Sequence, residues 1–219
     1  MFAVKLNLAN YEYDVHSLVK AFYPEETVKV LSPDTKEETV AEVLAQTGGV
    51  GMDIEIFENH ADILFEERKY HWDYTETEGK FKDGFKRFLY RTMSEVLGKE
   101  LPWGNLTGIR PTKIAYGMLE EGKSHEEIST FLKESHYVSE EKIDLSIDIA
   151  KREKELLSDI HYEGGYSLYI GIPFCPTTCL YCSFTSYPIA GYRKLVEDYV
   201  DCVIKEMDYV SKKYAHKIL

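Results

Sequence analysis

The stretch YIGIPFCPTTCLYC, which runs from Tyr169 to Cys182, decides how the rest of this sequence is interpreted. An apolar and aromatic run from Tyr166 to Ile172 leads into it and predicts a β-strand. Three of the four cysteines follow with the spacing Cys-x3-Cys-x2-Cys, namely Cys175, Cys179 and Cys182. We interpret the stretch as a strand that ends in a ligand-bearing loop.

Three closely spaced thiols suit an iron–sulfur cluster. A [4Fe–4S] cluster has four iron corners, and Cys thiolates are its usual ligands. One loop with three cysteines can hold three corners, and the fourth iron is then open to a small molecule, as in catalytic metal sites. We therefore predict that Cys175, Cys179 and Cys182 bind a [4Fe–4S] cluster.

A structural zinc site is the alternative use of these cysteines. Structural zinc nearly always takes four protein ligands, and the nearby candidates for the fourth are His161 and Cys202. Cys202 falls in a periodic helical stretch, where we expect a packed residue. The paired Cys-x2-Cys knuckles of zinc ribbons are missing. A disulfide framework is also disfavoured, because no signal peptide is evident and 219 residues can build a core without disulfides.

A long amphipathic helix is expected directly after the loop. From Tyr192 onward, apolar residues recur at helical spacing to Val210. Strand, loop and helix together form a βα unit with its ligands at the carboxyl end of the strand, where barrel enzymes place their chemistry. The predicted fold class is therefore α/β, and residues 164–219 are expected to start a barrel.

The preceding residues divide into two further parts. Residues 1–99 predict a small α+β domain with mostly antiparallel strands, in which residues 37–46 suit either a short helix or an irregular segment. Residues 100–163 predict a helical connector, in which Ser124 and Glu127 form a capping box. Pro111 is expected to be the first residue of a helix.

A second informative stretch, LPWGNLTGIRPTK, runs from Leu101 to Lys113. Its glycines and prolines predict a shaped loop. Arg110 is either an anion contact or a structural residue that pairs with an acidic neighbour. Composition favours the structural interpretation.

Composition limits the classes of function. The formal net charge is −12, which disfavours nucleic acid as a partner. No apolar run approaches the length of a membrane span. The free thiols suggest a reducing, cytoplasmic setting.

The cysteine spacing, the lead-in YIGIPFC and the aromatic Tyr181 before the last cysteine resemble the radical S-adenosylmethionine (SAM) superfamily. The lead-in is similar to the oxygen-independent coproporphyrinogen III oxidase branch. The stretch from Leu101 to Lys113 looks like the HemZ-like coproporphyrinogen dehydrogenases of that branch. This resemblance implies a partial (β/α)6 TIM-like barrel, with Tyr169 and Tyr181 in contact with SAM.

The resemblance also implies an activity. In the family, SAM chelates the open iron and is cleaved to a 5′-deoxyadenosyl radical, which abstracts hydrogen. In this branch the outcome is oxidative decarboxylation of two propionates of coproporphyrinogen III to vinyl groups in haem biosynthesis. A porphyrinogen is thus the expected substrate, while the electron donor and acceptor stay open.

Departures from the branch leave alternatives open. Better-defined oxidases have His where Gly171 stands, and an extra Cys where this chain has Ser183-Phe184. A haem chaperone of the same branch, or another radical SAM enzyme, is the alternative function. Only one of about six expected βα units is present, so we expect an N-terminal fragment that is inactive alone.

Overall fold

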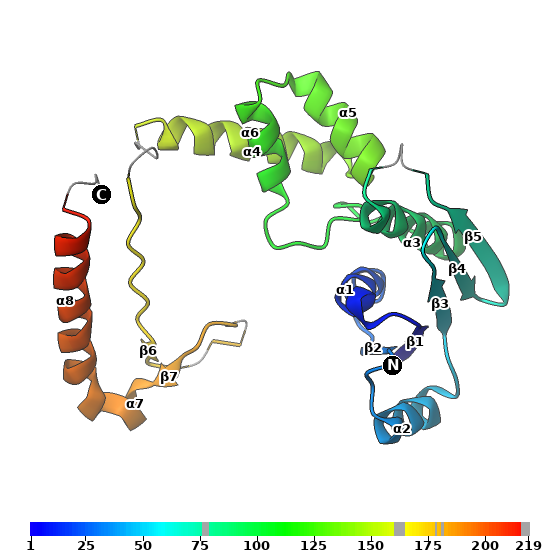
Figure 1. Cartoon of the computed structure of the whole chain (residues 1–219), viewed down its shortest axis with the longest axis horizontal. Coiled ribbons are helices and arrows are strands. Elements are labelled where there is room, and N and C mark those ends of the chain that lie inside the picture. The colour runs from blue at the N-terminus through cyan, green and yellow to red at the C-terminus, as the bar shows by residue number, and fades with distance from the viewer. Residues whose placement is uncertain (76–78, 160–164, 178, 181, 216–219) are drawn as a thin grey trace. The chain divides into compact units, whose positions relative to one another are not determined.

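The computed structural model describes residues 1–75, 79–159, 165–177, 179–180 and 182–215. The chain forms two compact units, Met1–Leu156 and Leu157–Leu219. Each unit is described by itself, with its elements labelled in Figure 1.

The N-terminal unit is built on a five-stranded mixed sheet with the strand order β2-β1-β3-β4-β5. The internal strand β1 pairs in parallel with β2 and with β3, whereas β3, β4 and β5 form an antiparallel meander. The prediction of mostly antiparallel strands therefore holds for β3, β4 and β5 and is wrong for the two pairs that β1 forms. The reason is that a helix follows β1 and another follows β2, and a helical crossover returns the chain in the same direction. The strands are β1 (Phe2–Leu6), β2 (Val28–Leu31), β3 (Met52–Ile56), β4 (His60–Phe65) and β5 (Arg68–Asp73).

Alternation along the strands gives the sheet two apolar faces. Val4 and Val30 belong to the main core, together with α1 (Glu12–Phe22) and α3 (Phe81–Leu97). Their neighbours Ala3 and Leu31 point to the opposite face and pack with Val43 of α2 (Glu37–Thr47). The segment that the sequence left undecided is therefore a helix, because Val43 covers this second face.

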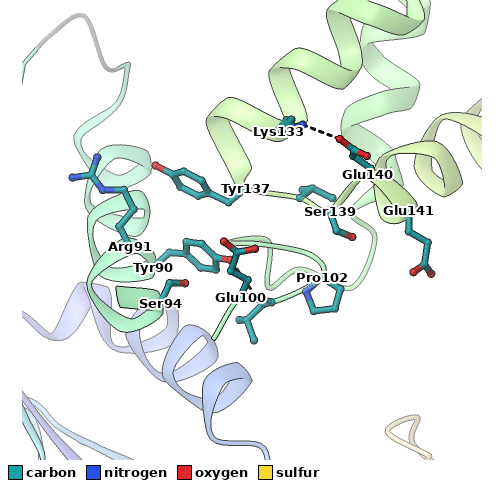
Figure 2. Close-up of a pocket in the computed structure, with 12 residues that line it drawn as sticks. Tyr90, Arg91, Ser94, Glu100, Pro102, Lys133, Tyr137, Ser139, Glu140 and Glu141 are labelled. Carbon is teal, nitrogen blue, oxygen red and sulfur yellow. Dashed lines mark hydrogen bonds and ion pairs between the residues drawn. The ribbon is translucent and has the colours of Figure 1, made fainter. Parts of the chain in front are cut away.

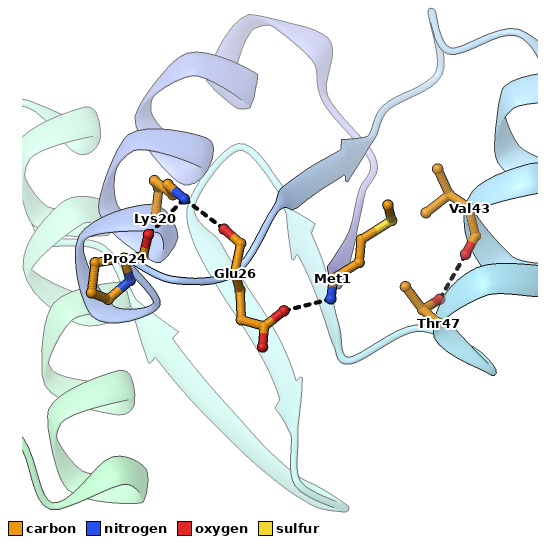
Figure 3. Close-up of polar contacts among 6 residues, drawn as sticks. All are labelled: Met1, Lys20, Pro24, Glu26, Val43 and Thr47. Carbon is orange, nitrogen blue, oxygen red and sulfur yellow. Dashed lines mark hydrogen bonds and ion pairs between the residues drawn. The ribbon is translucent and has the colours of Figure 1, made fainter. Parts of the chain in front are cut away.

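Polar contacts close the ends of the first two helices, as Figure 3 shows. The Lys20 ammonium donates to the carbonyls of Pro24, at 2.9 Å, and Glu26, at 2.6 Å, where the chain leaves α1. The Glu26 carboxylate accepts from the terminal amine of Met1 at 2.5 Å. The Thr47 hydroxyl donates to the Val43 carbonyl at 2.9 Å in the last turn of α2. The Lys20 bonds tie the last turn of α1 to the segment that leads into β2.

Three helices complete the N-terminal unit, and they share a second apolar core. The capping box is confirmed, since Glu127 N donates to Ser124 Oγ at 3.2 Å and Ser124 N donates to the Glu127 carboxylate at 2.7 Å. Pro111 is the N-cap residue of its helix instead of the first helical residue. The helices are α4 (Thr112–Glu120), α5 (His125–His136) and α6 (Glu140–Leu157).

The C-terminal unit contains two short strands and a long helix. β6 (Phe174–Cys175) pairs in parallel with β7 (Tyr187–Pro188), and α7 (Ile189–Tyr192) and a 3-10 turn (Arg193–Leu195) lead into α8 (Val196–Lys213). The predicted long helix is confirmed. The predicted strand over residues 166–172 is wrong, because in the part of the chain that the structure describes no strand pairs with those residues. A backbone becomes a strand through ladder hydrogen bonds, and the apolar pattern alone does not supply them.

Candidate functional site

The loop that carries the cysteines is closed at its base. Phe174 lies opposite Tyr187 and Cys175 lies opposite Pro188 in the short ladder between β6 and β7. The Tyr187 amide also donates to the Pro173 carbonyl at 2.7 Å. Cys175 therefore sits in the paired base, while the other two cysteines follow in the loop.

The three predicted ligands are free thiols. Cys175 and Cys182 are half-buried, and Cys179 is exposed. A turn joins the last two, since the Cys182 amide donates to the Cys179 carbonyl at 3.0 Å. One short segment therefore carries three cysteines that form no disulfide.

These thiols are not drawn together around a centre. Among the described residues, no three His, Cys, Asp or Glu side chains are grouped so that they could hold a metal ion. The donor set nevertheless fits an iron–sulfur cluster in chemistry, because three free thiols on one loop are the ligand type that such clusters use. Ligand loops commonly take up their final arrangement with the metal, since binding and folding are coupled. The assignment of the three ligands stays a prediction.

The two candidates for a fourth zinc ligand differ in status. His161 lies outside the described residues. Cys202 is exposed on α8, so the expectation of a packed residue is wrong. The reason is that no residue of α8 is buried in the described part of the chain.

Of the two expected SAM contacts, the structure describes only Tyr169. Its side chain is 84% exposed, and its ring lies across Gly171, where an added Cβ would meet Tyr169 Cε1 at 3.2 Å. A phenol ring in this position is accessible to a ligand. Tyr181 lies outside the described residues.

Sequence reasoning missed Tyr199, which joins α8 to the segment before β6. Its hydroxyl donates to the Gly171 carbonyl, and its ring meets the Phe174 ring edge-on at 5.4 Å between centroids. In the sequence Tyr199 is one of several apolar residues at helical spacing. The one sequence signal for the contact was the hydroxyl group itself, because a hydroxyl on an apolar helix face needs a hydrogen-bond partner.

The stretch from Leu101 to Lys113 has a structural role within the N-terminal unit. Arg110 forms an ion pair with Glu153 of α6 at 2.6 Å, so the structural interpretation of this residue is confirmed. Gly104 and Asn105 are buried at the end of α5, where the Asn105 amide donates to the His136 carbonyl at 3.0 Å.

A cavity of about 730 Å³ lies beside this stretch, and Figure 2 shows its lining. The stacked rings of Tyr90 and Tyr137 and the pair of Lys133 with Glu140, 2.9 Å apart, border it. Its charges are of both signs and several of its side chains are already paired. The cavity therefore does not indicate one ligand class.

None of the described helices is both long enough and apolar enough for a membrane span.

Comparison with known proteins supports the resemblance found in the sequence. No family model and no solved structure matches the chain. The chain is 34% identical over 139 residues to the oxygen-independent coproporphyrinogen-III oxidase-like protein HemZ of Bacillus subtilis (strain 168). The match covers 60% of this chain, and the chain spans 28% of the length of that protein. The predicted HemZ-like resemblance is therefore confirmed.

Proposed function

We propose that this chain carries the cluster-binding loop of a radical SAM protein that acts on a porphyrinogen. The observation that carries the proposal is the set of three free thiols, with Cys175 in the paired base of β6 and with Cys179 and Cys182 in the loop that follows. The similarity to a coproporphyrinogen-III oxidase-like protein supports the substrate class. The barrel fold, the three-part division of the chain and the activity are parts of the same proposal.

Each residue of the loop has a role in this proposal. The three thiolates would hold a [4Fe–4S] cluster and leave one iron without a protein ligand. When bound, the cluster supplies the electron that cleaves SAM reductively. The exposed Tyr169 would pack against SAM, and Tyr181 is the second proposed contact. The β6–β7 ladder fixes the base of the loop, so that Cys175 has a defined backbone position.

The proposed reaction removes two propionate carboxyl groups from coproporphyrinogen III. Each propionate loses a hydrogen atom from its β-carbon, a molecule of carbon dioxide and one electron, and a vinyl group remains. SAM is consumed as the hydrogen acceptor, and a separate acceptor takes the electron. The protein's contribution is to orient SAM and substrate and to exclude water.

The test is anaerobic reconstitution with iron and sulfide, followed by metal analysis and electron paramagnetic resonance (EPR) of the reduced protein with and without SAM. We expect about four irons per chain in the wild type. Cys179→Ala should lose most of the iron, because it removes one of three ligands. Cys202→Ala is the matched control and should keep it, since Cys202 lies on α8 outside the loop.

Three outcomes would count against the proposal. Stoichiometric zinc in place of iron would make the cysteines a structural site. Equal iron loss in Cys179→Ala and Cys202→Ala would show that the cysteines of the loop are not the specific iron ligands. Tight haem binding without any change of the EPR signal on adding SAM would favour haem carriage over catalysis.

A further inference from the structure

We infer that Tyr199 is a positioning residue, which holds the backbone ahead of Cys175 against α8 and so fixes how the loop presents its first thiol. The inference deepens the proposed function and rests on it only where a cluster is concerned. The claim about the backbone stands on the contacts alone.

Tyr199 makes two different contacts with one short segment. Its hydroxyl donates to the carbonyl of Gly171, and its ring packs edge-on against Phe174, with the ring planes at 88°. Three residues of chain span at most about 10 Å, so Gly171 and Phe174 lie within that distance of each other. One side chain therefore spans the last residues before the first cysteine.

A second aromatic contact shows that the segment runs along α8. Tyr166 stacks on Tyr214 at 5.1 Å, near the far end of the helix. Phe174 contacts Tyr199 near the start of α8. The segment before β6 and α8 therefore lie side by side, as Figure 1 also shows. Tyr199 is the contact next to the loop, while Tyr214 holds the opposite end.

The contact reaches Cys175 through its neighbours. Phe174 directly precedes Cys175 and pairs with Tyr187 in the short ladder. The Tyr187 amide donates to Pro173, between the two residues that Tyr199 touches. If Tyr199 holds this base closed, loss of its hydroxyl should let the base open more often. Sites need such supporting contacts if their ligands are to be held in place.

The first measurement uses the 219-residue chain without metal. We expect the Tyr187 amide to exchange with solvent about fivefold faster in Tyr199→Phe, because one neutral hydrogen bond changes an opening equilibrium by about that factor. Tyr199→Ala should exchange faster still, since it also loses the ring contact. Tyr209→Phe is the matched control, because Tyr209 lies on the same helix and meets Lys213 instead.

Amides of β4 in the N-terminal unit report any general destabilisation, and they should be unchanged in all variants. Equal exchange of Tyr187 in wild type and Tyr199→Phe would overturn the inference. This result does not depend on a cluster, so it separates the inference from the proposed function.

The second measurement uses reconstituted protein. Tyr199→Phe should keep the iron content of the wild type, whereas its EPR g-values should shift, and those of Tyr209→Phe should not. Faster exchange with an unchanged spectrum would show that Tyr199 stabilises the fold without positioning a ligand. Absence of iron from the wild type would count against the proposed function and leave the exchange result to decide on the contact.

Discussion

At the scale of single residues, His71 bridges two carboxylates on the sheet. Its Nδ1 lies 2.6 Å from the Asp62 carboxylate and its Nε2 lies 3.1 Å from Asp73. These hydrogen bonds, first that to Asp62, raise the pKa of His71 above its ordinary value of 6.5. The same contact lowers the pKa of Asp62. His71 therefore binds its proton more tightly in the folded protein than in the unfolded chain.

This shift predicts a pH-dependent effect of His71→Gln on unfolding. A raised folded pKa contributes stability that is fully present below 6.5 and is lost as the pH rises through the folded value. The urea midpoint of the variant should therefore fall below that of the wild type at about pH 5.5, and the difference should shrink by about pH 9. A difference that grows toward alkaline pH would contradict the prediction.

Only the difference between the variant and the wild type is informative, because another histidine acts in the opposite sense. Burial lowers the pKa of His136, so its contribution is present above the ordinary value and is lost as the pH falls. The two contributions partly cancel in the wild-type curve. They separate when His71 alone is changed.

At the scale of elements, Gly104 lets the loop dock on the end of α5. Its φ is +54°, and an added Cβ would lie 1.8 Å from the His136 carbonyl oxygen. Next to it, Asn105 is bonded twice to His136, through its amide to the carbonyl and through Oδ1 to the ring Nδ1 at 2.9 Å. A side chain at position 104 would push these groups apart.

Gly104→Ala should therefore destabilise the chain by at least about 2 kcal/mol, from left-handed strain and the backbone clash together. Gly108→Ala is the matched control in the same stretch, because an added Cβ there meets nothing within 4 Å. It should leave the free energy of unfolding nearly unchanged. Both values come from urea unfolding at one pH, and equal effects of the two substitutions would contradict the docking role.

Elements with local signals were predictable from the sequence. The apolar spacing after Tyr192 predicted α8, and the Ser124–Glu127 pair predicted the start of α5. Elements that depend on distant partners were not. The apolar run at residues 166–172 lacks a paired strand among the described residues, and the parallel pairs of β1 depend on crossovers that periodicity does not show.

The candidate site was likewise predictable from the sequence only in part. The spacing of the cysteines and their similarity to known motifs are properties of the sequence alone, and they are enough to identify the ligand candidates. The support from Tyr199 came only from the structure, because a tyrosine at an apolar helical position is ordinarily a packing residue. A bond between a side chain and a backbone carbonyl 28 residues away carries no sequence signature of its own, unlike a local capping box.

At the scale of the whole molecule, the two units differ in how much apolar surface they bury. Strands β3 and β4 place Ile54 and Ile63 in a core with no exposure. In α8, by contrast, Val200, Ile204 and Met207 are 46%, 51% and 43% exposed. Stability against local opening follows the number of buried contacts. The N-terminal unit should therefore be the part of the chain that is more resistant to local unfolding.

Hydrogen exchange should show this division and its change with iron. Without metal, we expect slow exchange in β3 and β4 and fast exchange in residues 165–173, where no ladder protects the amides. Reconstitution with iron and sulfide should slow exchange between Cys175 and Pro188, because three ligands on one centre restrain the loop. The same treatment of Cys179→Ala should slow it much less. Slower exchange in the sheet of the N-terminal unit would contradict this view, since it would mean that iron stabilises the chain through a site other than the cysteine loop.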